Sequence, residues 1–209
     1  MPTGTTKRRP RTVTALLDAA FELFAEQGYG ATSIPEICGR AGLTKGAFYS
    51  NYANKEALFL ALLDRSWAER SASIRRALPG HETEPDGARS GSLAAFPPET
   101  VDRQWTLVST EFSLHAIRRP EVAALLVEHE LRVRGELAHL IAEALERSGR
   151  RPSLPVDELA RMVVAVTEGS DIQVLTDAAG GVPTHAGEGA RTVAALLEHF
   201  SAPSAGGPS

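Results

Sequence analysis

The stretch Thr32–Lys55, TSIPEICGRAGLTKGAFYSNYANK, decides the fold predicted for this chain. Ser33 is followed three residues later by Glu36, which is the spacing of a capping box at the start of a helix. Gly42 permits a sharp reversal of the chain, because glycine adopts backbone angles that other residues avoid. Thr44 then caps a second helix. The stretch therefore predicts two short helices joined by a tight turn.

The second of these helices, predicted to run to about Asn51, has an outward face of unusual composition. Its residues are small, polar or aromatic: Lys45, Gly46, Ala47, Tyr49 and Ser50. Small residues let a backbone approach another molecule closely, and polar side chains can bond to it. Such a face is typical of a recognition helix that enters the major groove of DNA.

Several residues in and beside this stretch stand at characteristic distances from one another along the sequence. They are Thr32-Ser33, Ile37, Ala41-Gly42-Leu43-Thr44-Lys45-Gly46, Phe48-Tyr49 and Lys55-Glu56-Ala57-Leu58. Together they resemble the helix-turn-helix signature of the tetracycline-repressor (TetR/AcrR) family of transcriptional regulators. The resemblance covers the first third of the chain. It departs from the family at Asn51-Tyr52, where the family often has His-Phe.

The resemblance implies binding to double-stranded operator DNA and assigns roles to the matching positions. Tyr49 and Lys55 are expected to contact phosphates, aided by Ser33 and Thr44 at helix N-termini, where backbone N–H groups favour anions. Lys45 is expected to contact a base, with Gly46, Ala47 and Ser50 allowing close approach. Phosphate contacts set the register on the duplex, whereas base contacts set sequence preference.

The rest of the sequence shows helical spacing of apolar residues. Helices are predicted over residues 12–27, 55–78, 100–118, 120–148, 156–178 and 186–200. The composition of residues 79–99, rich in Gly, Pro, Ser and charges, predicts a long loop. The composition of the tail after residue 200 predicts a flexible segment, and no strand pattern is found. The predicted class is all-α, with a three-helix helix-turn-helix head in residues 1–54. The resemblance implies that residues 55–209 form a helical body for ligand binding and dimerisation.

Charge is distributed unevenly along the chain, whose net charge is −4. Residues 1–66 hold eight basic and six acidic residues, whereas the remainder holds 14 basic and 20 acidic residues. A slightly basic head on an acidic body suits an end that faces a polyanion. Residues 1–11 include Lys7, Arg8, Arg9 and Arg11 and predict a flexible arm that adds phosphate contacts on DNA.

Other classes of protein find little support in the sequence. No apolar run approaches the roughly 20 residues that span a bilayer, and the N-terminus lacks the apolar core of a signal peptide, so no membrane contact and a cytoplasmic location are expected. Cys38 is the only cysteine and lies on an apolar helix face, which indicates packing. Six scattered histidines and the lack of a nucleophile motif predict no metal, no cofactor and no enzyme.

A small-molecule pocket is predicted in the body. The helices predicted over residues 100–118 and 120–148 carry aromatic and apolar residues on more of their surface than one core-facing side needs. A few polar residues lie in the apolar stretches of the body, as they do in ligand pockets. The candidate ligand-binding residues are Trp105, Phe112, His115, Leu126, His129 and Gln173. They indicate an apolar or aromatic effector. Ordinary core packing is the alternative for each residue.

A homodimer is implied by the same resemblance, with the interface on the last two helices. The candidate interface residues are Met162, Val163, Val166, Val193, Leu196 and Leu197. Their alternative role is also core packing. The hypothesis that results is a regulator, a repressor released from a palindromic operator by a small ligand. One alternative is a dimeric DNA-binding regulator controlled by a protein partner without a small ligand, and another is an enzyme whose head matches the pattern by chance.

Overall fold

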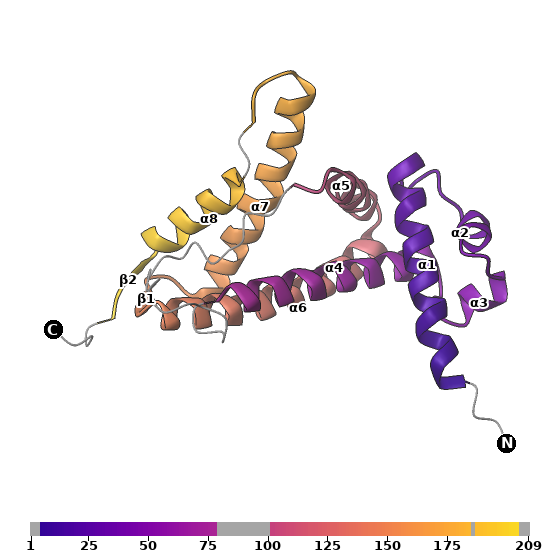
Figure 1. The fold of residues 1–209 in the computed structure, drawn as a ribbon, viewed down its shortest axis with the longest axis horizontal. Coiled ribbons are helices and arrows are strands. Elements are labelled where there is room, and N and C mark those ends of the chain that lie inside the picture. Colours follow the sequence, from indigo (N-terminus) through magenta and orange to yellow (C-terminus); the bar gives the residue numbers. More distant parts are fainter. Residues whose placement is uncertain (1–4, 79–100, 185–186, 205–209) are drawn as a thin grey trace. The chain divides into compact units, whose positions relative to one another are not determined.

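The computed structural model describes residues 5–78, 101–184 and 187–204 (Figure 1). Its helices are α1 (Thr5–Gln27), α2 (Ile34–Arg40), α3 (Lys45–Tyr49), α4 (Lys55–Ala77), α5 (Arg103–Ile117), α6 (Pro120–Arg147), α7 (Val156–Ala179) and α8 (Glu188–His199). The predicted all-α class with a helix-turn-helix head is confirmed. The loop predicted over residues 79–99 lies outside the described residues. No helix among the described residues is long and apolar enough to cross a membrane.

The largest shift of a helix boundary is at the start of α1, which begins at Thr5 and not at residue 12. The helix continues through Pro10, and the side chains of Arg9, Pro10 and Arg11 are exposed. Apolar spacing marks only a buried face, and exposed Arg9, Pro10 and Arg11 give it no signal. The predicted flexible arm is therefore helical from Thr5 onward.

A small sheet corrects the prediction that the chain has no strands. Strand β1 (Arg150–Pro152) pairs antiparallel with β2 (Ser201–Pro203), and Arg151 lies opposite Ala202. The Arg150 guanidinium donates to the Ser201 hydroxyl at 2.8 Å and to the carbonyl of Glu198 at 2.9 Å. Three-residue strands are too short for alternation to show, and the pairing depends on residues about 50 positions apart. The start of the predicted flexible tail is thus ordered.

Packing divides the chain into two compact units. Unit 1 comprises Met1–Ser66 and Arg103–His129, and unit 2 comprises Trp67–Asp102 and Glu130–Ser209. Helix α5 and the first part of α6 therefore pack with α1–α3 and the start of α4. The functional division predicted at residue 54 stays a prediction.

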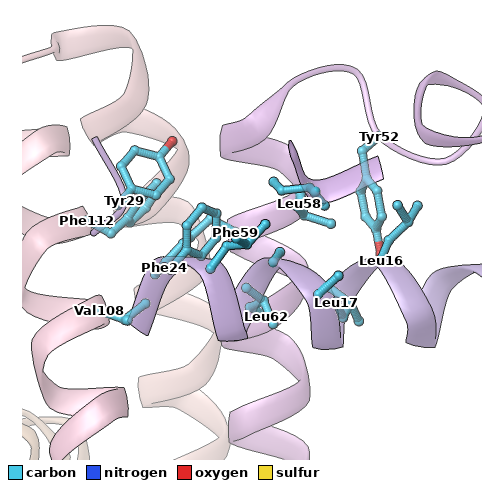
Figure 2. Close-up of a cluster of buried hydrophobic side chains, with 14 of the residues drawn as sticks. Leu16, Leu17, Phe24, Tyr29, Tyr52, Leu58, Phe59, Leu62, Val108 and Phe112 are labelled. Carbon is cyan, nitrogen blue, oxygen red and sulfur yellow. The ribbon is translucent and has the colours of Figure 1, made fainter. Parts of the chain in front are cut away.

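Unit 1 is built on an apolar core to which each of its helices contributes. Figure 2 shows Phe24 of α1, Phe59 of α4 and Phe112 of α5 beside Tyr29, which follows α1. The rings of Phe59 and Phe112 stack at 3.9 Å, and each of these four side chains is at most 1% exposed. Removing one such ring from water contributes about 1.5–3 kcal/mol to folding. Buried Ile37, Cys38 and Phe48 attach α2 and α3 to the same core, so the predicted packing role of Cys38 is confirmed.

Unit 2 has a separate core that joins the end of α4 to α6, α7 and α8. Its buried residues are Ile74, Leu137, Ala138, Leu140, Ile141, Leu145, Leu159, Ala160, Val163, Val193 and Leu197. The Trp67 ring nitrogen donates to Glu136 at 2.6 Å and ties α4 to α6 within the unit. Helices α7 and α8 pack closely, since a Cβ at Gly189 would lie 3.0 Å from the Ser170 hydroxyl oxygen.

Candidate nucleic-acid interface

The start of α2 is fixed by the predicted capping box. The Ser33 backbone N–H donates to Glu36 Oε2 at 2.8 Å, the Ser33 hydroxyl donates to the same oxygen at 2.6 Å, and the Glu36 N–H reaches Ser33 Oγ at 3.5 Å. These bonds, led by the Ser33 hydroxyl, hold the pKa of Glu36 below its usual value. The N-terminal N–H groups of α2 thus have a defined direction.

The turn between α2 and α3 depends on Gly42, which has a φ of +65°. At this angle the Leu43 N–H returns to the Cys38 carbonyl at 2.8 Å and closes the end of α2. A side chain at position 42 would strain the backbone, because left-handed angles disfavour residues with a Cβ. The turn therefore sets the angle at which α3 leaves α2.

Helix α3 is anchored by one side chain and exposes the others. Phe48 is fully buried, and the Thr44 hydroxyl accepts the Ala47 N–H at 3.1 Å as the cap of the helix. Tyr49 is 57% exposed although it is aromatic. Lys45, Gly46 and Ser50 are also exposed, and Ala47 is partly exposed. The structure thus brings the predicted recognition residues together on one accessible face.

Gly46 has no internal packing reason to be a glycine. A Cβ at this position would meet only the Thr44 hydroxyl oxygen, at an ordinary distance of 3.6 Å. The Ser50 hydroxyl is already used within the helix, since it donates to the Gly46 carbonyl at 2.7 Å. Its oxygen can still accept a bond from outside. An open glycine on an exposed helix is consistent with close approach by another molecule.

Lys55 lies in a different environment from Lys45. Its ammonium donates to the carbonyls of Tyr29 and Thr32, each at 2.6 Å, and lies 4.2 Å from the centre of the Tyr29 ring. Partial burial lowers the pKa of Lys55. Two of its three donors are therefore engaged inside the protein, a role that the sequence did not indicate. The predicted phosphate contact of Lys55 stays a prediction.

Arg40 is a basic residue of α2 that sequence reasoning left without a role. Its guanidinium pairs with Glu22 at 3.1 Å and with Glu26 at 2.7 Å, both on α1. The bond from Arg40 lowers the pKa of Glu26. Arg40 therefore connects α2 to α1. The sequence could not predict these ion pairs, because Glu22 and Glu26 lie on another helix and their distance from Arg40 along the chain follows no local rule.

Five of the six predicted ligand residues lie in unit 1. Phe112 is buried among the aromatic side chains, and the His115 ring lies 4.9 Å from that of Tyr29 and 3.3 Å from a Glu56 carboxylate oxygen. Trp105 faces Phe21, with ring centres 6.1 Å apart. Leu126 packs against the same core, and His129 Nδ1 lies 3.2 Å from Asp64. Gln173 is exposed on α7 in unit 2. These ligand roles stay predictions.

The predicted dimer residues mostly pack inside unit 2. Val163, Val193 and Leu197 are at most 5% exposed, which leaves them little surface for a partner. Val166 and Leu196 are partly buried against the same core. Met162 alone of the six is exposed, at 36%, and Ile172 on the same helix is 45% exposed. The described residues contain no group of three or more His, Cys, Asp or Glu side chains that could hold a metal ion.

Two family profiles cover both parts of the chain. The profile of bacterial regulatory proteins of the tetR family matches residues 16–62, and that of the C-terminal region of BetI-type transcriptional repressors matches residues 86–201. The second match alone covers more than half of the chain. The chain belongs to the TetR family. It is a member of a family of DNA-binding transcriptional regulators, as the exposed face of α3 indicates.

Proteins similar to this TetR-family chain match it over most of its length. The transcriptional regulator UidR of Escherichia coli is 25% identical over 159 residues, which are 76% of this chain and 79% of UidR. The structure of GusR from Salmonella enterica matches with a TM-score of 0.66 at 22% identity, over 90% of this chain and 94% of GusR. A regulator from Saccharomonospora viridis, solved in complex with choline, matches with a TM-score of 0.58 at 20% identity, over 94% and 98% of the two chains.

Proposed function

We propose that the protein is a repressor that binds a palindromic operator as a homodimer and leaves it when a small molecule binds. The outward face of α3 carries this proposal, because Lys45, Gly46 and Tyr49 are exposed while Phe48 anchors the helix. The similarity of residues 86–201 to BetI-type repressors supports repression. A two-fold dimer presents two such helices to half-sites about one helical turn apart.

Each residue of the interface receives a role in this proposal. Lys45 contacts a base edge, and Tyr49 and Lys55 contact phosphates. Ser33 and Thr44 cap α2 and α3 and direct backbone N–H groups towards the DNA backbone. The small side chains of Gly46, Ala47 and Ser50 allow the helix backbone to approach the walls of the major groove closely.

The effector in this proposal is a small organic molecule with an apolar or aromatic part. The choline-bound relative supports a small organic ligand in a protein of this fold. Trp105, His115, Leu126 and His129 are the candidates for contact, because they are partly exposed. Phe112 is 1% exposed and would shape a site from behind.

The test begins with the DNA next to the gene. Fluorescence anisotropy with fragments of this DNA should identify an operator with two inverted half-sites. A panel of small molecules that includes choline should then raise the melting temperature, because a ligand that binds the folded state stabilises it. The ligand that does so should weaken operator binding, and the operator should weaken ligand binding by the same factor. Equal ligand affinity with and without operator would exclude release by that ligand.

Control by a protein partner is the second candidate. Large apolar side chains on α5 favour it, since Leu114 is 47% and Ile117 is 77% exposed. In this case no small molecule shifts the melting temperature. Replacing Ile117 by Ser would then abolish regulation in the cell while the purified protein keeps its operator affinity.

A further inference from the structure

Several backbone polar groups of the short loop between α1 and α2 are held by hydrogen bonds with neighbouring side chains. Gly28, with a φ of +89°, ends α1 through its N–H bond to the Phe24 carbonyl at 2.9 Å. The Thr32 hydroxyl donates to the Gly28 carbonyl at 2.8 Å. Lys55 of α4 holds the carbonyls of Tyr29 and Thr32. Ser33, the cap of α2, follows at once, so the position of this loop sets where α2 begins.

The Tyr29 N–H is held by a residue from outside the helix-turn-helix sequence. It donates to the Glu111 carboxylate of α5 at 2.7 Å, across 82 positions of the chain. A hydrogen bond to a charged acceptor is about twice as strong as a neutral one. A Cβ at position 28 would lie 2.9 Å from the same carboxylate oxygen. Gly28 therefore leaves the space that Glu111 occupies.

Helix α5 also supports the Tyr29 side chain. The Tyr29 ring packs edge-on against Phe112 at 5.1 Å and against His115 at 4.9 Å. Figure 2 shows Phe112 directly beside Tyr29. Glu111, in contrast, is an exposed residue whose described contacts are with Gly28 and Tyr29. Its loss would release the loop backbone without opening a cavity in the core.

We propose that Glu111 is a positioning residue for operator binding. Its carboxylate fixes the Tyr29 backbone and so fixes the direction in which α2 and α3 leave α1. This inference rests on the proposed operator binding. Without the bond, the loop takes up additional conformations. The observed operator affinity then falls in proportion to the fraction of molecules whose loop keeps the conformation that binds DNA.

The experiment compares three variants. Glu111→Ala removes the acceptor, Glu111→Gln keeps an acceptor oxygen without the charge, and Glu128→Ala removes an exposed carboxylate elsewhere in unit 1. Operator affinity is measured by anisotropy well below the melting temperature, with folding checked by circular dichroism. Hydrogen exchange of the Tyr29 amide is measured on the same samples.

Glu111→Ala should weaken operator binding about tenfold, as expected when a partly buried N–H loses its charged partner and the loop loses its fixed position. It should also speed exchange at the Tyr29 amide. Glu128→Ala should stay within about twofold of the unchanged protein, because Glu128 takes no part in the bond. Glu111→Gln should lose less affinity than Glu111→Ala, because its neutral oxygen still accepts a weaker bond. A purely structural role would lower the melting temperature and leave the affinity of the folded molecules unchanged.

Three results would overturn the inference: operator affinity unchanged in Glu111→Ala, equal losses in Glu111→Ala and Glu128→Ala, or Tyr29 exchange unchanged. If Glu111→Ala does not fold, Glu111→Asp replaces it, since its shorter side chain does not reach the Tyr29 amide. If the unchanged protein binds no operator, the proposed function fails, and Tyr29 exchange still decides whether Glu111 holds the loop.

Discussion

At the scale of single residues, the two lysines of the helix-turn-helix differ in what surrounds them. Lys45 is exposed on α3, whereas Lys55 is held by two carbonyls and lies over the Tyr29 ring. A lysine free in solvent can adapt to a base edge. A lysine whose ammonium already donates to two carbonyls, such as Lys55, has only one N–H left for a phosphate. Its bonds to the carbonyls also fix the loop between α1 and α2.

Lys45→Ala should relax sequence preference at one base pair in each half-site. Loss of a side chain that reads a base costs about 1–3 kcal/mol of discrimination against the wrong base. The measurement is anisotropy against a set of operators, each changed at a single position. Arg76→Ala, which removes a charge from the exposed end of α4, should leave the preference intact. An unchanged preference in Lys45→Ala would assign the base contact elsewhere.

Lys55→Met should lower the melting temperature and weaken binding to every operator variant alike. Methionine retains the apolar stem but leaves two carbonyls without a charged donor, a loss of about 1–3 kcal/mol. The salt dependence of binding separates the two roles of Lys55. A slope that falls by about 1 shows a phosphate contact, and an unchanged slope shows that Lys55 acts through the loop alone. An unchanged melting temperature would contradict the structural role.

At the scale of elements, local signals predicted what local contacts decide. The capping box at Ser33, the turn at Gly42 and the cap at Thr44 are confirmed, because each depends on residues within a few positions. The bond from Tyr29 to Glu111 has no local signal, since its partners are 82 positions apart. The same reason hid the pairing of β1 with β2 and the packing of α5 in unit 1. Apolar spacing identifies the buried face of a helix but not what covers it. It therefore could not distinguish core residues such as Val193 from residues of a dimer interface.

The capping box gives a prediction about acid. The pKa of Glu36 is lowered mainly by the Ser33 hydroxyl. Because the pKa in the folded state lies below that in the unfolded state, the box stabilises α2 above the ordinary value of 4.5, and this contribution is lost as the pH falls through the folded pKa. Ser33→Ala should move the pKa of Glu36 upwards, towards 4.5, in an NMR titration. A pKa that stays unchanged in Ser33→Ala would show that another group lowers it.

At the scale of the whole molecule, we propose an exposed apolar face of α7 as the interface of the homodimer. Met162 and Ile172 lie on it, with Ala165 exposed and Gly169 partly exposed between them at helical spacing. A dimer through this face would leave the unit 2 core intact. Val163, Val193 and Leu197 would then support the interface from beneath.

Met162→Glu combined with Ile172→Glu should give a folded monomer by light scattering and circular dichroism. Charges in an apolar interface lose solvation without gaining a partner. Operator affinity should fall sharply, because one recognition helix makes too few contacts. Val193→Glu is the matched control, and it should unfold unit 2, since Val193 is 3% exposed. A double variant that remains dimeric would place the interface on another face.

The division of the chain into units also sets an order of events during synthesis. Unit 1 is complete once His129 has left the ribosome, whereas unit 2 needs β2 at Ser201–Pro203 to close against β1. At about 5–20 residues per second, the roughly 70 residues in between delay unit 2 by several seconds. We expect a nascent chain stalled beyond residue 160 to resist protease across unit 1 before unit 2 is protected. The proposed recognition helix α3 would then be folded before unit 2, which carries the proposed dimer interface.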